Sequence, residues 1–357
     1  MDKNNGIEII HRFLYNIIMI KLKNISLVHY VFLLLGLVVG FSVHYFFTIH
    51  DNKNMASQSL RIKDQQYPLI NPLLACGYND AAKDEGFNGM RGKIDKIIND
   101  EKSSGNIDDV GVYFRDLDSG KWTGVNEDNN FSPASLIKVQ LMIAYYKLAE
   151  SDKELLTKKY KYTDIPNYNQ AETYYSKNNF TNGKYYAVDD LIRSMIINSD
   201  NNAYSVLYDG MDRKTLDATY ADLQLSIPKD MNIIDFESSK SYSIVLRLLY
   251  NATYLNKEMS NKALALLSDI KFRKGIASAL PGTTVIADKF GERAFDKADG
   301  KNGKTNIKEL HDCGIVYYPS HPYLLCVMTK GKDFVKLEEV IHKVSQAAYE
   351  GVKNNYK

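Results

Sequence analysis

Segments rich in β-branched and aromatic residues lie in two groups far apart in this chain, and this order constrains the fold more than any other feature. The first group, residues 110–115 and 121–125, flanks an Asp-Ser-Gly turn and is typical of a hairpin. The second group lies near the C-terminus, at residues 283–288, 314–318 and 323–329. We therefore expect one antiparallel sheet of about five strands, assembled from both ends of a single domain.

Helical periodicity characterises the rest of this domain. Apolar residues recur at helical spacing before the first strand group, between the two groups and after the last strand. Helices are predicted at residues 82–102, 135–150, 188–198, 202–208, 242–255 and 337–352. The predicted fold class is therefore α+β: helices flank the antiparallel sheet, and an all-helical subdomain is inserted between the two groups of strands.

An apolar stretch near the N-terminus predicts a membrane anchor. Residues 25–49 contain no Lys, Arg, Asp or Glu and are long enough to cross a bilayer as a helix. Cationic side chains precede this stretch, so the positive-inside rule places residues 1–24 in the cytoplasm. A cleaved signal peptide is the alternative. We expect a polar linker at residues 50–81 and a domain at residues 82–357, both on the extracytoplasmic side of the membrane.

The composition excludes several kinds of protein. With 45 basic and 43 acidic side chains, the formal net charge is +2, and no clustered cationic charge indicates a nucleic-acid surface. A hydrophobic content of 45% excludes global disorder. No Cys/His spacing indicates a metal site, and no cofactor is expected. Cys313 and Cys326 are interpreted as free buried thiols, with a disulfide as the alternative in an oxidising compartment.

A Ser-x-x-Lys pattern provides the first candidate site residues. It occurs at Ser135/Lys138, Ser226/Lys229 and Ser268/Lys271. Only Ser135 opens a strongly apolar helix, where backbone N–H groups point at its hydroxyl and the amine of Lys138 lies one turn on. A lysine acts as a base when burial or a second cation lowers its pKa towards neutrality. The alternative is that Ser135 is an ordinary helix N-cap and Lys138 a surface lysine.

Two further motifs follow in the chain. A Ser-Asp-Asn run at residues 199–201 ends an apolar helical segment, and a Lys-Phe-Gly run at residues 289–291 comes directly after a predicted strand. A helix-end turn and a solvated lysine are the alternative interpretations. The three motifs together, in this order, indicate a serine acyl-transfer site in which a lysine activates the nucleophile.

With these motifs, residues 82–357 resemble the class A β-lactamase-like branch of the penicillin-recognising serine hydrolases. The order of strands and helices is also similar to that family. The resemblance implies that Ser135 is the acylated nucleophile and that Lys138 is its general base. It further implies that Ser199 passes a proton to the leaving nitrogen of the substrate.

The resemblance also implies the substrate-binding groups. Asn201 would hold the amide side chain of the substrate, and Lys289 would recognise its carboxylate and support Ser199. The oxyanion hole would consist of two backbone N–H groups, those of Ser135 and of Glu292, which follows Gly291.

The third motif departs from the family pattern, because Phe290 replaces a Thr or Ser whose hydroxyl binds the substrate carboxylate. Arg293 and His311 are candidate replacement donors by position alone. Five polar groups of the three motifs are nevertheless present. A scaffold that has lost acylation is therefore the least favoured hypothesis.

A second departure concerns deacylation. Class A β-lactamases carry a Glu-x-x-x-Asn pattern on a loop after the second motif, and the corresponding residues 221–241 contain Asp230, Asp235 and Glu237 but no such pattern. We therefore expect a serine hydrolase that forms an acyl-enzyme with β-lactams or peptidoglycan-like peptides and hydrolyses β-lactams slowly. The alternative is a D,D-peptidase or penicillin-binding sensor domain that holds a stable adduct.

Overall fold

The structure is a computed structural model that describes residues 32, 34–42, 60–61, 65–75, 87–174, 177–225, 234–298 and 304–356. The chain divides into two units, residues 1–57 and 58–357. The anchor predicted at residues 25–49 lies mostly outside the described residues, which contain only a short helical segment of it. A search of the described helices finds none with the length and apolar character of a membrane span.

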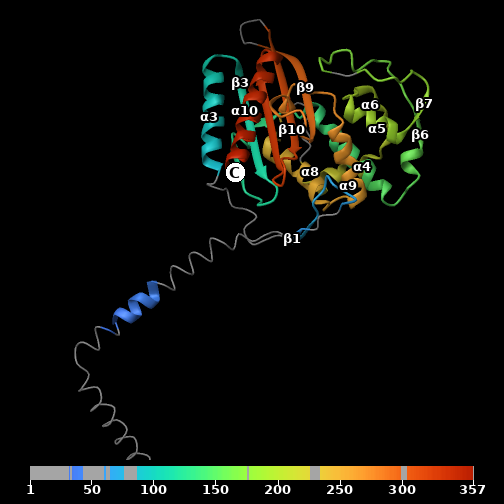
Figure 1. Ribbon diagram of the computed structural model, residues 1–357. Coiled ribbons are helices and arrows are strands. Elements are labelled where there is room, and N and C mark those ends of the chain that lie inside the picture. Colours follow the sequence, from blue (N-terminus) through green and yellow to red (C-terminus); the bar gives the residue numbers. More distant parts are fainter. Residues whose placement is uncertain are drawn as a thin grey trace, which may run out of the picture. The chain divides into compact units, whose positions relative to one another are not determined.

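A five-stranded antiparallel sheet forms the centre of the second unit (Figure 1). Its strands, in spatial order, are β4 (Trp122–Val125), β3 (Ile107–Asp116), β11 (Tyr323–Gly331), β10 (Lys304–Val316) and β9 (Ile286–Ala298). Strands from the two ends of the domain therefore meet where β3 pairs with β11. This arrangement confirms the predicted α+β class and the assembly of the sheet from both ends.

Helices cover the sheet and form the inserted block. They are α3 (Asn88–Ser103), α4 (Lys138–Ala149), α5 (Val188–Ile197), α6 (Asn201–Gly210), α7 (Arg213–Asp222), α8 (Ser239–Asn251), α9 (Lys257–Ser268) and α10 (Phe334–Asn355). Helices α3 and α10 pack together beside the sheet, while α4, α5 and α6 are grouped away from them (Figure 1). Helix α8 also packs on the sheet, against β3, β10 and β11. The inserted helical subdomain is thus present between β4 and β9 in the chain.

Two helices of this block were not predicted. Helix α7 buries only Leu216 and Thr219, so its apolar periodicity is weak. Helix α9 begins at a cap in which the side chain of Asn256 accepts a hydrogen bond from the backbone N–H of Met259. The apolar periodicity of α9 is weak because its buried face includes small and polar residues. The buried residues are Ser260, Ala263, Leu264, Leu266 and Leu267.

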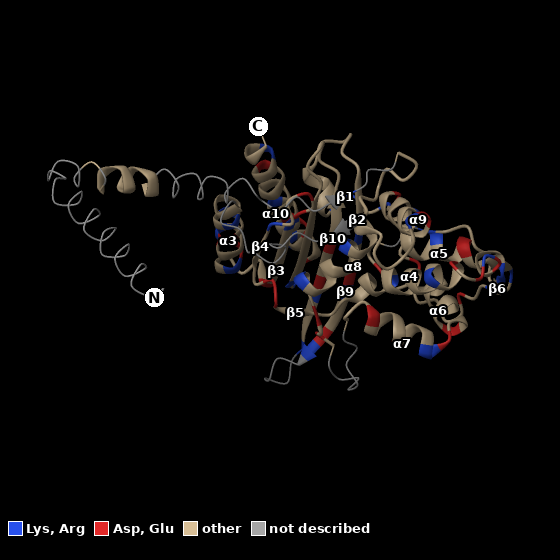
Figure 2. Ribbon diagram, turned by 90° about the horizontal axis from the view of Figure 1, so that it is seen from below, with Lys and Arg blue, Asp and Glu red and all other residues tan. Residues whose placement is uncertain are grey.

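Short elements complete the second unit. Three two-stranded pairs join β1 (Leu60–Arg61) to β2 (Leu73–Ala75), β5 (Asn130–Phe131) to β8 (Glu237–Ser238), and β6 (Lys159–Lys161) to β7 (Tyr185–Ala187). The described residues also contain the short 3-10 turns η2 (Ala134–Ile137), η3 (Leu155–Thr157) and η4 (Ile276–Ala279). Acidic and basic residues are interspersed over the helices and strands of the second unit, in keeping with the nearly balanced charge (Figure 2).

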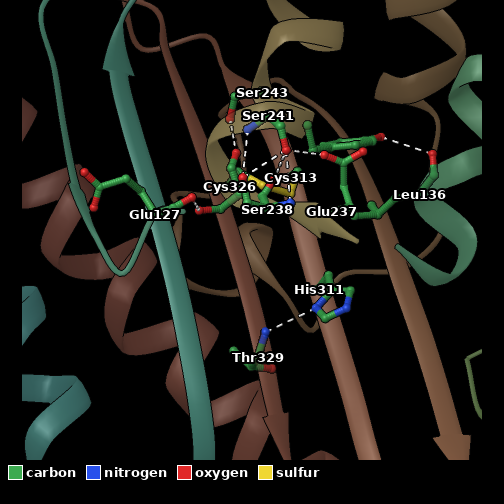
Figure 3. The surroundings of a disulfide bond; sticks show 12 residues. Glu127, Leu136, Glu237, Ser238, Ser241, Ser243, His311, Cys313, Cys326 and Thr329 are labelled. Atoms are coloured by element: carbon green, nitrogen blue, oxygen red, sulfur yellow. Dashed lines mark hydrogen bonds between the residues drawn. A yellow bond between two sulfur atoms is a disulfide. The ribbon is translucent and has the colours of Figure 1, made fainter. Parts of the chain in front are cut away.

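The strands of the C-terminal group are longer than predicted, and two interpretations are wrong. Lys289 lies inside β9 and not after its end, because backbone pairing with β10 continues through polar residues that carry no strand pattern. Cys313 and Cys326 are directly opposite each other on β10 and β11 and form a disulfide, so they are not free thiols (Figure 3).

Candidate active site

The candidate nucleophile Ser135 lies in the turn η2, just before α4. The sequence predicted one continuous helix from Ser135, but a 3-10 turn comes first and Ile137 is the N-cap of α4. Ser135 is therefore not the helix N-cap that the alternative interpretation required. Ala134 has a φ of 46°, which is unfavourable for a residue with a Cβ. Backbone strain next to a candidate nucleophile is typical of functional turns.

Gly291 lets strand β9 touch the serine turn. A Cβ at this position would lie 3.0 Å from the carbonyl oxygen of Pro133 and 3.3 Å from the Cβ of Ala134. Any side chain here would crowd the serine turn, so glycine favours this close approach between the two backbones. This contact places the backbone of Glu292, the next residue, beside the turn that carries Ser135. The two N–H groups predicted to form an oxyanion hole thus belong to neighbouring segments.

Two lysines converge on the hydroxyl of Ser199. Lys138 Nζ donates to Ser199 Oγ at 3.1 Å and to Ser199 O at 2.7 Å. Lys289 Nζ donates to the same Oγ, also at 3.1 Å. Ser199 has a φ of 58°, so this residue too adopts a strained conformation. Lys138, Ser199 and Lys289, one residue from each motif, therefore form one cluster.

Burial controls the charge of both lysines. Lys138 is 1% exposed and Lys289 is fully buried, which overturns the alternatives of a surface lysine and a solvated strand end. Burial lowers the pKa of Lys138 to about 8, although the nearby charge of Glu172 opposes this effect. Burial, followed by the charge of Lys138, lowers the pKa of Lys289 well below its ordinary value. A free amine is thus accessible near neutral pH, as a general base requires.

Asp200 and Asn201 hold the beginning of α6. The carboxylate of Asp200 caps the helix by accepting from the backbone N–H groups of Asn202 and Ala203. The side chain of Asn201 donates to Glu172 Oε1 at 2.7 Å and to the carbonyl oxygen of Tyr168 at 3.1 Å. The predicted substrate-binding amide is therefore at the site, but both of these bonds connect it to the segment that precedes β7.

Sequence reasoning missed two carboxylates at the site. Glu172 lies beside Asn201, and the side chain of Glu292 accepts from the backbone N–H groups of Thr173 and Tyr174 at 2.8 and 2.7 Å. Burial, together with the nearby carboxylate of Glu172, raises the pKa of Glu292 to about 7, although the backbone N–H groups of Tyr174 and Thr173 oppose this effect. The sequence contained no signal for Glu172, because no motif surrounds it. For Glu292, only the backbone N–H was predicted to act.

Phe290 belongs to an aromatic cluster. Its ring stacks on Phe272 with centroids 4.4 Å apart and meets Tyr174 edge to face. The position of the expected hydroxyl is thus filled by packed rings. His311 does not replace this donor: its Nε2 is bonded to Ser132 O, and its Nδ1 accepts from the backbone N–H of Thr329. Arg293 stacks on Phe295, with its guanidinium carbon 4.6 Å from the ring centroid.

The acidic residues of the segment expected to carry a deacylation base have other contacts. Glu237 is buried and accepts from the hydroxyl of Ser241 (Figure 3). Asp235 pairs with Lys330 at 2.6 Å, and Asp230 lies outside the described residues. The charges that act on Lys138 are instead those of Glu172, Asp200 and Glu292. Within the described parts of the chain, no group of three or more His, Cys, Asp or Glu side chains could hold a metal ion.

This domain is similar to known proteins in sequence and in fold. The family model described as "Beta-lactamase enzyme family" matches residues 90–352. No curated protein matches the sequence. Among solved structures, an acyl-enzyme complex of a PBP-A mutant with penicillin G is similar, with a TM-score of 0.59 and 19% identity over 74% of this chain and 97% of that chain.

Two β-lactamases are similar to the same degree. The class A β-lactamase from Mycobacterium abscessus has a TM-score of 0.60 and 20% identity, over 73% of this chain and 99% of that one. A β-lactamase from Xanthomonas campestris has a TM-score of 0.61 and 19% identity, over 75% and 98%. At these identities the structures show a shared fold. The family match covers most of the chain, and the protein therefore belongs to the β-lactamase enzyme family and is a serine hydrolase.

Proposed function

We propose that Ser135 is acylated by β-lactams or peptidoglycan-like peptides, and that the acyl-enzyme is hydrolysed slowly. The observation that carries this proposal is the convergence of Lys138 and Lys289 on the hydroxyl of Ser199. Such a cluster moves protons between a serine nucleophile and a leaving nitrogen.

Acylation follows from these contacts. Ser135 Oγ attacks the carbonyl carbon of the substrate, and its proton passes to the free amine of Lys138. The negative charge on the carbonyl oxygen is stabilised by the backbone N–H groups of Ser135 and Glu292. The carbon–nitrogen bond then breaks while Ser199 Oγ gives its proton to the leaving nitrogen. Lys138 returns a proton to Ser199 through the 3.1 Å contact between them.

Substrate recognition rests on two further residues. Lys289 would attract the substrate carboxylate, and Asn201 would bind the acyl amide. Phe290 offers no hydroxyl to that carboxylate, so we expect weaker recognition than a Thr or Ser would allow. A PBP-A mutant with a similar fold has been captured as an acyl-enzyme with penicillin G, which supports penicillin as a probe for this protein.

Deacylation is the step in which this protein differs from class A β-lactamases. Residues 221–241 lack a Glu-x-x-x-Asn pattern, and Glu237 in that stretch is bonded to Ser241. Without a carboxylate to activate water, the adduct should persist. This feature also favours the second candidate function, a D,D-peptidase or penicillin-binding sensor domain that keeps its adduct.

Intact-mass spectrometry tests the proposal. The protein is mixed with penicillin G and followed for minutes to hours beside Ser135→Ala. An adduct that forms on the wild type alone and outlasts many minutes supports slow deacylation. An adduct on Ser135→Ala refutes the nucleophile, and rapid turnover with no lasting adduct refutes slow deacylation. Absence of any adduct indicates another acyl substrate or a site that has lost acylation.

We also propose that residues 25–49 anchor the protein, with the catalytic domain on the extracytoplasmic side. The apolar stretch and the preceding cationic residues support this topology. The disulfide between Cys313 and Cys326 also favours an oxidising compartment. Cell fractionation and protease treatment of intact cells test it. A soluble, protease-protected domain contradicts the proposed topology.

A further inference from the structure

Residues 167–174, here called the crossing segment, are bound to the start of α6 at one end. The backbone N–H of Tyr168 donates to Asn202 Oδ1 at 2.8 Å. The side chain of Asn169 accepts from the backbone N–H of Asn201 at 2.7 Å and donates to Asp200 Oδ1 at 2.9 Å. Asn169 is itself buried, so this end of the segment is firmly held beside the Ser-Asp-Asn motif.

The other end of the crossing segment is bound to strand β9. Glu292 accepts from the consecutive backbone N–H groups of Thr173 and Tyr174. The ring of Tyr174 packs against Phe272 and Phe334, with centroids 5.1 and 5.5 Å away. Since α6 and β9 carry the second and third motifs, the segment passes from one wall of the candidate site to the other.

Glu172 lies at the middle of this crossing. Its Oε1 accepts from Asn201 Nδ2 at 2.7 Å, and its carboxyl group lies close enough to that of Glu292 to act on its pKa. Asn201 Nδ2 donates in addition to the carbonyl oxygen of Tyr168. In the proposed function, Asn201 is the donor that binds the carbonyl oxygen of the substrate amide. Glu172 therefore occupies the acceptor position that this substrate oxygen needs.

We propose that Glu172 is a built-in competitor of the acyl substrate, and that Glu172 must release the side chain of Asn201, and Thr173 and Tyr174 must release Glu292, before a substrate reaches Ser135. The inference rests on the proposed function, since it takes Asn201 as the substrate's amide donor. A substrate binds only the open form, so its apparent affinity falls by the fraction of molecules that are open. Substrates with an amide next to the reacting carbonyl regain the bond to Asn201 that opening breaks.

A matched pair of variants tests this role. Glu172→Ala removes the acceptor, whereas Glu172→Gln keeps an oxygen for Asn201 and adds an N–H that can donate to Glu292. The full chain is mixed with penicillin G, and the second-order rate of adduct formation is measured by intact mass. We expect Glu172→Ala to be acylated about tenfold faster than wild type, because a hydrogen bond to a charged group shifts an equilibrium by roughly that factor. Glu172→Gln should react no faster than wild type.

If Glu172 had only a structural role, Glu172→Ala would not be acylated faster than Glu172→Gln. If Glu172 were a catalytic residue, both variants would be acylated more slowly than wild type. Equal rates in all three proteins, or slower acylation or deacylation in both variants, would overturn the proposal. Hydrogen–deuterium exchange provides a readout that needs no β-lactam. Exchange at the Thr173 and Tyr174 amides should be faster in Glu172→Ala and unchanged in Glu172→Gln.

The two measurements separate this inference from the proposed function. If no protein forms an adduct but exchange rises in Glu172→Ala alone, the proposed substrate class is wrong and the closure by Glu172 stands. If adducts form but exchange and acylation are the same in Glu172→Ala as in wild type, the proposed function stands and the closure is wrong.

Discussion

Two lysines of this domain, Lys138, which is buried, and Lys330, which is partly exposed, have opposite electrostatic outcomes. Lys330 on β11 contacts two carboxylates, Asp235 at 2.6 Å and Glu309 at 2.9 Å. Burial alone would lower its pKa, but the interactions with these two carboxylates together outweigh burial and raise it. Lys138 donates only to oxygens of Ser199 among its described hydrogen bonds, and burial lowers its pKa to about 8.

The difference shows that burial and the bonded partner together decide whether a lysine can act as a base. A directly bonded carboxylate keeps the amine protonated and makes it a structural cation. The hydroxyl and carbonyl oxygens of Ser199 accept hydrogen bonds from the amine of Lys138, but they carry no negative charge that would keep this amine protonated. The carboxylate of Glu172 acts on Lys138 but is hydrogen-bonded to Asn201, which leaves the amine able to lose its proton.

Replacing Lys138 should give the largest effect. Lys138→Met keeps the length and burial of the side chain but removes the amine. We expect acylation by penicillin G to slow by about 10³-fold, which lies within the usual contribution of a positioned general base. Intact-mass spectrometry of samples quenched at successive times gives the rate of adduct formation, and circular dichroism checks that the variant is folded. Acylation within a factor of about 3 of wild type would show that another group activates Ser135.

Lys330→Met is the same substitution at the lysine that we interpret as structural. It leaves the fully buried Glu309 without its cation, so the free energy of unfolding should fall by about 3 kcal/mol. Acylation per folded molecule should stay close to wild type, because Lys330 is bonded to Asp235 and Glu309 and to no member of the three motifs. Denaturant unfolding measures the first quantity. If Lys330→Met loses acylation but keeps its stability, the assignment of a structural role to Lys330 and a catalytic role to Lys138 is wrong.

The pH dependence of acylation sharpens the same comparison. Only the free amine of Lys138 accepts a proton, and its pKa is about 8. The rate should therefore rise about tenfold per pH unit below that value and level off above it. The second-order rate is measured from about pH 6 to pH 9 at constant ionic strength, with Ser135→Ala as the control for spontaneous hydrolysis. A flat profile between pH 6 and pH 8 would show that Lys138 is not the titrating base.

The sequence was sufficient for the sheet and for the motif residues, because both depend on local patterns. Strand composition predicted the strands, and the order of the motifs in the chain pointed to Lys138, Ser199 and Lys289, which the structure brings together. Glu172 was missed because its contacts with Asn201 and Glu292 join segments that are far apart in the sequence. No periodicity or motif records such a contact. The length of β9 was missed for a related reason, since backbone pairing with β10 extends it through polar residues.

The smallest expected effect on acylation comes from replacing Phe290, which follows the buried Lys289 in the chain. Phe290→Thr restores a hydroxyl beside Lys289 but removes a ring from the stack with Phe272. We expect adduct formation with penicillin G to rise by a few-fold, roughly the value of one hydrogen bond. Stability should fall by about 3 kcal/mol, because the smaller side chain leaves a cavity.

Phe290→Leu separates these two consequences. It disturbs the aromatic cluster without supplying a donor, so it should lose stability and gain no acylation. If both variants are acylated faster, loosening of the cluster around Tyr174 is the cause, and the hydroxyl is not. That result would connect Phe290 to the crossing segment, since Tyr174 packs on this cluster and is held by Glu292. The aromatic cluster beside Lys289 would then control the entry of the substrate into the site, and would matter less for recognition of the substrate carboxylate.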